Sequence, residues 1–217
     1  MVGMRFMLAT CNRHKLGEFQ KILAPLEVLP MPAWVELPPE GVESFADNAR
    51  DKALGLARAL AAGPPAAAGP PGLFCLADDS GLEVEALGWA PGVTSARYAG
   101  VDGHGADAAN VARLLREMAG CAGPLARRAR FVCSVVAIAS DMREYAATGH
   151  WWGAIATAPR GEGGFGYDPV FVPEGSDLTV AEWPQADKDQ ASHRALAGTA
   201  LLTLLRQEGL LDGGPHG

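Results

Sequence analysis

The 217-residue sequence lacks several features that would assign it to a specialised class of protein. Its four cysteines show no CxxC spacing and lie mostly within apolar stretches, which favours buried thiols in a reducing compartment over disulfides or zinc ligands. Excess positive charge is also absent. The formal net charge of −7 argues against nucleic acid or an anionic membrane as the main partner, although a few local cations could still hold a free nucleotide.

Long hydrophobic runs are missing as well. No apolar run approaches the length that spans a membrane, and Arg5 and the polar residues 12–15 interrupt any hydrophobic region of a signal peptide. We therefore expect a cytoplasmic protein. The apolar content of 48% is ordinary for a globular protein, and the length suits a single domain over residues 1–217 built as two lobes.

Hydrophobic periodicity predicts interspersed strands and helices. Strands are expected at 5–9, 27–29, 73–77, 82–87, 131–139, 143–152 and 170–172, and helices at 13–23, 45–62, 107–118 and 193–208. Asn12, Ser44 and Ser192 are the expected N-caps. Residues 140–142 should close a hairpin, and the low-complexity segment 63–72 should form a surface loop. Five residues of the last helix are expected to face the core: Leu196, Thr199, Leu202, Thr203 and Leu205. This order predicts an α/β protein with a mixed central sheet flanked by helices.

The most informative segment is Leu-Ala-Asp-Asp-Ser-Gly-Leu-Glu at 76–83. An apolar strand leads into two adjacent carboxylates, and Ser80-Gly81 is expected to break the run. Like charges side by side resist burial, so this is a poor way to build a core. It suits a divalent cation, and oxygen ligands of this kind suit Mg²⁺. The alternative is a strand end with two solvated aspartates.

Two loops could bind a nucleotide. Thr10, Asn12 and Lys15 lie on a strand-to-helix turn, where backbone N–H groups and a lysine attract phosphate; the alternative is an ordinary cap with an exposed lysine. The segment 161–168 matches G-x-G-x-x-G, but an apolar strand rather than a helix follows it, so a dinucleotide fingerprint is rejected. We interpret it as a loop that presents Phe165 for stacking, or one that packs Phe165 and Tyr167 into the core.

A further cluster comprises Lys188 and the sequence Ser192-His193-Arg194. Cations are disfavoured at the positive end of a helix dipole, so an anionic or carbonyl partner opposite them would explain their position. A Ser-His-Asp triad is not favoured, because the sequence has no G-x-S-x-G elbow.

Together these motifs closely resemble the inosine triphosphate pyrophosphatase family, whose members clear dITP, ITP and XTP from the nucleotide pool. They occur in the family's order along nearly the whole chain: T-x-N-x-x-K at 10–15, S-F-x-D-N-A at 44–49, A-D-D-S-G-L at 77–82, A-R-Y-A-G at 96–100, G-G-F-G-Y-D-P at 163–169 and S-H-R at 192–194. Three departures are evident. Cys11 stands where the family usually has glycine, which could alter phosphate affinity; Asp47 replaces a common glutamate; and segment 63–72 looks like an insertion.

The resemblance implies the site residues. The triphosphate would be gripped by Thr10, Cys11, Asn12, Arg13, His14 and Lys15. Asp79 would accept the proton of the attacking water and bind Mg²⁺, with Glu40, or its rival Glu43, as the second metal carboxylate and Ser80 as a substrate contact. The base pocket would comprise Phe165, Gly166, Tyr167, Asp168, Lys188, His193 and Arg194.

The implied function is hydrolysis of dITP, ITP or XTP to the monophosphate and pyrophosphate, by a magnesium-dependent homodimer with an active-site cleft between the lobes. Donors such as Arg194 or Lys188 would favour a 6-carbonyl and be left unpaired by adenine, at roughly 1–3 kcal/mol per group. Two alternatives are a related house-cleaning pyrophosphatase for another modified nucleotide, and a nucleotide-binding protein without turnover. The preferred sugar and the means of excluding guanine are left open.

Overall fold

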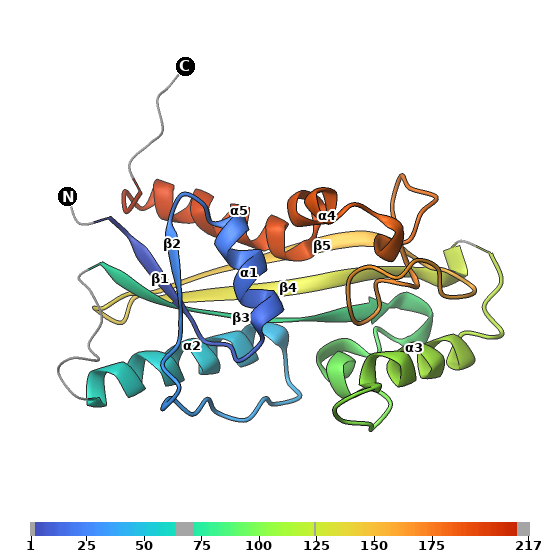
Figure 1. Ribbon diagram of the computed structural model, residues 1–217, viewed down its shortest axis with the longest axis horizontal. Helices are drawn as coiled ribbons and strands as arrows, with labels where there is room; N and C mark the ends of the chain where they lie inside the picture. The colour runs from blue at the N-terminus through green and yellow to red at the C-terminus, as the bar shows by residue number, and fades with distance from the viewer. Residues whose placement is uncertain (1–2, 64–71, 124, 212–217) are drawn as a thin grey trace, which may run out of the picture. The chain divides into compact units, whose positions relative to one another are not determined.

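A computed structural model of the protein describes residues 3–63, 72–123 and 125–211 (Figure 1). Six strands form one sheet in the order β2-β1-β3-β4-β5-β6. The strands are β1 (Arg5–Leu8), β2 (Glu27–Pro30), β3 (Leu73–Val84), β4 (Arg128–Ile138), β5 (Glu144–Ile155) and β6 (Phe171–Pro173). Strand β1 runs parallel to β2 and β3, whereas β5 and β6 are antiparallel, so the predicted mixed sheet is confirmed.

The helices are α1 (Arg13–Ile22), α2 (Phe45–Ala62), α3 (Ala106–Glu117), α4 (Gln185–Ala191) and α5 (His193–Gln207). Two predicted N-caps are confirmed: the Asn12 side chain accepts hydrogen bonds at the start of α1, and the Ser44 side chain does so at the start of α2. The short helix α4 was not predicted. It buries Lys188 but none of its apolar side chains, so it has no hydrophobic periodicity to detect.

The chain divides into two compact units. Unit 1 comprises Met1–Asp79, Cys133–Gly149 and Arg194–Gly217, and unit 2 comprises Ser80–Val132 and His150–His193. The single domain with an active-site cleft between its lobes stays a prediction. The predicted surface loop at 63–72 lies, apart from its two end residues, outside the described residues.

In unit 1, helices cover both faces of the sheet (Figure 1). Helices α1 and α5 pack on one face, and α2 packs on the other through Ala49, Ala53 and Leu56. The prediction for α5 was largely wrong. Its buried face is formed by Ala197, Leu201 and Leu205, and of the five residues expected there only Leu205 is fully buried, while Leu196, Thr199 and Thr203 are exposed.

A close approach between α5 and α1 explains this error. A Cβ added to Gly198 would lie 2.5 Å from Cγ2 of Ile22, so the two helices meet where α5 has no side chain. The small residues Ala197 and Gly198 therefore face inward because they allow tight packing, and the larger leucine next to them points to solvent.

Unit 2 has its own core, in which aromatic rings dominate. Phe131 packs against Phe171 at a centroid distance of 4.6 Å, and Trp151 lies 5.6 Å from the same ring. Helix α3 contributes Val111 and Leu114. This core supports the glycine-rich segment and α4.

Strand β3 corrects another expectation. Ser80-Gly81 does not break the strand, which continues to Val84, and residues 85–87 form a short 3₁₀ turn rather than the end of a half-exposed strand. Leu82 and Val84 are fully buried, and the Leu82 amide donates to Oγ of Ser95 at 2.9 Å. The second apolar stretch therefore has its own packing and extends the strand.

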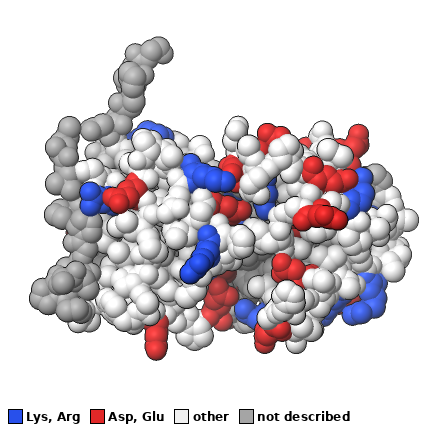
Figure 2. Space-filling model, in the orientation of Figure 1, with Lys and Arg blue, Asp and Glu red and all other residues white. Residues whose placement is uncertain are grey.

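The cysteines are free thiols as the sequence predicts, but Cys11 is exposed and not buried. All four cysteines are free, with Cys75 and Cys133 buried, Cys121 half-buried and Cys11 exposed. Lys and Arg side chains are interspersed with Asp and Glu on the face drawn in Figure 2. In the ranges that the structure describes, no helix combines the length and apolar character needed to cross a membrane.

Candidate active site

The candidate site of unit 1 lies where the parallel pairing of β1 with β3 ends. Leu8, the last residue of β1, is in register with Leu76, and β3 continues through Asp78 and Asp79, so the turn after β1 begins beside these acids. Ligand sites of open α/β sheets form outside the carboxyl ends of strands, here that of β1. The ammonium of Lys15 reaches Oδ2 of Asp78 at 2.9 Å, and Nε of Arg194 lies 3.6 Å from the same oxygen. Basic residues from both ends of the sequence thus meet at one carboxylate.

Asp78 is a buried counter-ion. Only 2% of its surface is exposed, which excludes the alternative of a solvated aspartate. Burial by itself would raise the pKa of Asp78, but the charges of Lys15, Arg194 and Lys52 outweigh burial and hold that pKa well below its usual range. Asp78 therefore stays ionised and is a poor proton acceptor.

Asp79 has the opposite tendency although it is the next residue. It is 6% exposed, its Oδ2 accepts a hydrogen bond from Nδ2 of Asn48 at 2.8 Å, and its Oδ1 lies 3.4 Å from Nζ of Lys52. Burial raises the pKa of Asp79, and Lys52 and Asn48 only partly oppose it. Adjacent carboxylates whose environments push their pKa values apart are typical of sites that divide catalytic roles, with the higher-pKa group suited to take a proton.

Glu40 joins this group through Lys52. The ammonium of Lys52 lies 2.9 Å from Oε1 of Glu40, so Glu40 and Asp79 share one cation. Glu40 and Glu43 are both exposed, and the contact of Glu40 with Lys52 favours Glu40 as the second carboxylate. Within the described residues, no three His, Cys, Asp or Glu side chains gather in a group able to hold a metal ion. Two carboxylates, completed by waters and substrate phosphates, nevertheless fit Mg²⁺.

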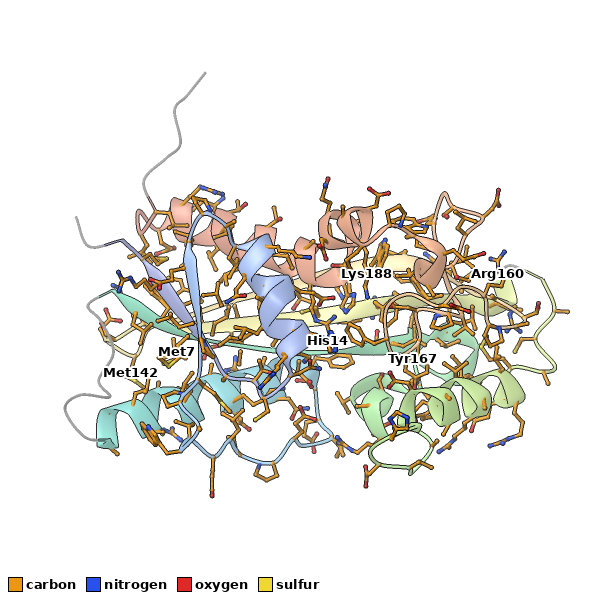
Figure 3. All side chains as sticks on the ribbon, in the orientation of Figure 1. Met7, His14, Met142, Arg160, Tyr167 and Lys188 are labelled. Carbon is orange, nitrogen blue, oxygen red and sulfur yellow. The ribbon has the colours of Figure 1, made fainter. Side chains whose placement is uncertain are left out.

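The turn before α1 is held by its own side chains. Oδ1 of Asn12 accepts from the amides of His14 at 2.9 Å and Lys15 at 3.3 Å, and Oγ1 of Thr10 accepts from the Asn12 amide at 3.1 Å. Cys11, Arg13 and His14 are exposed at this end of α1, where Figure 3 labels His14. Because the cap already occupies two amides, the cation of Lys15 and the helix dipole are the groups most available to a phosphate.

In unit 2, Asp168 organises the glycine-rich loop. Its Oδ2 accepts from the Phe165 amide at 2.9 Å and from Nζ of Lys188 at 2.5 Å. A Cβ at Gly164, whose φ is +72°, would collide with the same carboxylate. Nζ of Lys188 also lies 4.4 Å from the centroid of the Phe165 ring. Phe165, Asp168 and Lys188 are therefore brought together, the lysine from α4 and the others from the loop.

Two residues predicted to contact substrate are built into the core of unit 2. Tyr167 is buried, and its hydroxyl donates to the carbonyl of Ser95 at 2.9 Å. The His193 ring is buried and stacks on Phe131 at 4.8 Å. Both side chains thus support the loop and helix that carry them, and a direct contact of either with substrate stays a prediction.

Arg194 and Ser80 complete the predicted set. Nη1 of Arg194 lies 3.1 Å from Oε2 of Glu18, which together with its approach to Asp78 groups this arginine with the acids of unit 1. Its role in reading the base stays a prediction. Ser80 follows Asp79 on β3 and is half-buried.

Sequence reasoning missed four residues of these clusters. Asn48 and Lys52 hold Asp79, and Glu18 pairs with Arg194. Asp107 of α3 accepts the Gly166 amide at 2.7 Å. Asn48 and Lys52 are four residues apart, next to the buried Ala49 and Ala53. Polar residues on the apolar face of a helix were the signal that could have revealed them.

The fold is that of an α/β enzyme, and its candidate site contains two adjacent buried carboxylates. The chain belongs to the Ham1 family, whose sequence model matches residues 6–204. It is 44% identical over 213 residues to a dITP/XTP pyrophosphatase of Mycobacterium tuberculosis (93% of this chain, 95% of the relative) and 45% identical over 208 residues to one of Ralstonia nicotianae (93% and 96%). The solved Ham1 protein of Staphylococcus aureus has a TM-score of 0.77 at 33% identity, covering 94% of this chain and 99% of that one. The resemblance noted from the motifs is confirmed.

Proposed function

We propose that this protein hydrolyses the non-standard purine nucleoside triphosphates dITP, ITP and XTP to the monophosphate and pyrophosphate. The observation that carries the proposal is the contrast between Asp78 and Asp79, one held ionised by cations and the other held with a raised pKa. A chain 44% identical to proteins named dITP/XTP pyrophosphatase supports the choice of substrate.

Asp79 is the general base of this proposal. In the proposed step water attacks the α-phosphorus, the bond from that phosphorus to the α–β bridging oxygen breaks, and pyrophosphate leaves with this oxygen. Asp79 accepts the proton of that water, while Asn48, hydrogen-bonded to Oδ2, fixes the orientation of the carboxylate. Lys15, at the first turn of α1, binds a phosphate oxygen with a full positive charge.

Glu40 and Asp79 would hold Mg²⁺, which when bound supplies positive charge to the phosphate oxygens. The charges of the cluster support this need. In the described part of the chain, Lys15 and Arg194 lie beside Asp78, and Lys52 pairs with Glu40 and Asp79. These cations already face carboxylates when a triphosphate arrives, so a further positive charge would favour its binding.

Base recognition is assigned to residues of unit 2. Phe165 stacks on the purine, and Lys188, held by Asp168, donates to the 6-carbonyl oxygen. An adenine amino group would place a donor opposite this buried ammonium where the 6-carbonyl places an acceptor, and loss of that hydrogen bond costs roughly 1–3 kcal/mol. Discrimination against adenine follows from that loss.

The proposal also includes a homodimer in the cytoplasm, with no role for nucleic acid or membranes. The family resemblance supports the dimer, and the net charge of −7 supports the absence of polyanionic partners. Light scattering coupled to size-exclusion chromatography tests the dimer.

A substrate panel tests the activity. The protein is incubated with dITP, ITP, XTP, dATP, dGTP and a modified pyrimidine triphosphate, each with Mg²⁺ or EDTA, and pyrophosphate and orthophosphate are measured separately. We expect pyrophosphate from dITP, ITP and XTP with Mg²⁺ only. Preference for the pyrimidine would favour a related house-cleaning enzyme, and binding without hydrolysis of any substrate would favour a nucleotide-binding protein.

A further inference from the structure

Lys52 lies between the two carboxylates that the proposed function assigns to the metal. Its ammonium is 2.9 Å from Oε1 of Glu40 and 3.4 Å from Oδ1 of Asp79. Lys52 is only 7% exposed and Asp79 only 6%, so water and salt screen the contact between them poorly, whereas Glu40 reaches solvent. Lys52, a cation of the chain itself, therefore already neutralises the two acids that a divalent cation would bind.

Two residues of α2 hold Asp79 in this arrangement. Asn48 and Lys52 are one helical turn apart, and together they hold both oxygens of Asp79, since Asn48 donates to Oδ2 at 2.8 Å. Burial alone would lower the pKa of Lys52, but the charges of Asp78, Asp79 and Glu40 raise it. Lys52 thus stays charged between Glu40 and Asp79 within unit 1.

A metal ion and this ammonium compete for the same oxygens. Mg²⁺ binds oxygen ligands at about 2.0–2.1 Å and tolerates little departure from octahedral geometry. An ion held by Glu40 and Asp79 would lie beside the ammonium of Lys52, and two positive charges repel strongly where solvent is excluded. Lys52 has to withdraw before the ion can bind.

We infer that Lys52 is an internal competitor of the divalent cation, so that the nucleotide-free protein binds metal weakly and the triphosphate relieves the competition by offering Lys52 a new anionic partner. The inference rests on the proposed function for the identity of the metal carboxylates. By linkage, a nucleotide that draws Lys52 away raises the affinity for metal, and metal raises the affinity for nucleotide by the same factor.

The competing explanation is that Lys52 is only a structural counter-ion. In that case removing it would destabilise the protein through two uncompensated acids and would leave the affinity for metal unchanged. Competition predicts instead that metal replaces the missing charge. Metal binding to the nucleotide-free protein separates the two.

The experiment titrates the full-length, nucleotide-free protein with Mn²⁺ and follows free Mn²⁺ by electron paramagnetic resonance. Lys52→Gln and Lys52→Met remove the competitor. Lys21→Gln is the matched control, because it removes one positive charge from the same unit, in the last turn of α1. We expect at least about tenfold tighter binding for both Lys52 variants, about 1.4 kcal/mol, and a change below about twofold for Lys21→Gln. Equal affinities for wild type and the Lys52 variants would overturn the inference.

Wild-type protein provides a second test in case the Lys52 variants do not fold. The protein is labelled with acetic anhydride with and without saturating Mg²⁺, and peptide mass spectrometry compares acetylation of Lys52 with that of Lys21. We expect Mg²⁺ to increase labelling of Lys52 relative to Lys21, because the displaced ammonium becomes accessible. Unchanged relative labelling at saturating metal would contradict displacement.

The outcome is independent of the substrate panel. A protein that releases no pyrophosphate but gains metal affinity on loss of Lys52 would keep this inference and lose the proposed activity. A protein that releases pyrophosphate while its Lys52 variants bind metal like wild type would keep the activity and lose the inference.

Discussion

Replacing each of the two adjacent aspartates by asparagine should affect different properties. Asp78→Asn should mainly lower stability, and Asp79→Asn should mainly lower turnover. Asp78→Asn removes a buried charge that two cations face, Lys15 at 2.9 Å and Arg194 at 3.6 Å. Asp79→Asn removes a carboxylate whose pKa is raised, so the fold already disfavours its charged form. The amide has nearly the same shape in both cases, which makes the two variants controls for each other.

The magnitudes follow from these environments. Breaking a buried ion pair by removing one partner costs about 3–5 kcal/mol, so Asp78→Asn should lower the free energy of unfolding by that amount. Asp79→Asn should change it by less than about 1 kcal/mol, because Lys52 keeps its contact with Glu40 at 2.9 Å. Loss of a general base should lower kcat about 10²- to 10⁴-fold in Asp79→Asn.

Urea unfolding followed by circular dichroism measures the first quantity, and pyrophosphate release from dITP measures the second. Turnover of Asp78→Asn is measured only under conditions where the variant is folded. The reasoning fails if Asp79→Asn proves the less stable variant, or if it hydrolyses dITP at the wild-type rate.

Three further predictions concern other parts of the site and its support. Arg194→Lys should lower the free energy of unfolding in urea by about 1–3 kcal/mol, since one ammonium cannot reproduce both guanidinium contacts; equal stability would show that Asp78 needs only a charge. Asp107→Ala should raise KM for dITP roughly two- to tenfold with little change in kcat, because the Gly166 amide loses its acceptor. The control Asp107→Asn keeps an acceptor and should change KM less. A loss confined to kcat would contradict a positioning role for Asp107. Burial and a hydrogen bond to a carboxylate raise the pKa of Tyr98 to about 12, above its usual value of about 10. The neutral phenol therefore stabilises the fold below a pH of about 10, and this stability is lost as the pH rises toward about 12. Urea unfolding at about pH 9 and about pH 11 should show a smaller loss for Tyr98→Phe than for wild type, and equal losses would exclude this residue as the cause.

Elements with a local signal were predicted well. Asn12 and Ser44 cap their helices as expected, because a cap depends on a side chain and backbone groups only two or three residues away. Helix α4 was missed, since it lacks an apolar stripe, and the buried face of α5 was misjudged, since Gly198 meets Ile22. Both errors concern packing between segments far apart in the chain.

The order of the predicted strands and helices, the pair of acids that follows an apolar strand and the family itself are written in short-range patterns, which the sequence alone supplies. The difference in pKa between Asp78 and Asp79 is not written in such patterns, because neighbouring residues share almost the same local sequence. Only the tertiary structure brings Lys15 and Arg194 to one carboxylate and Asn48 and Lys52 to the other. Ionisation depends on the charges and the solvent within a few ångströms in space, and folding alone sets those distances.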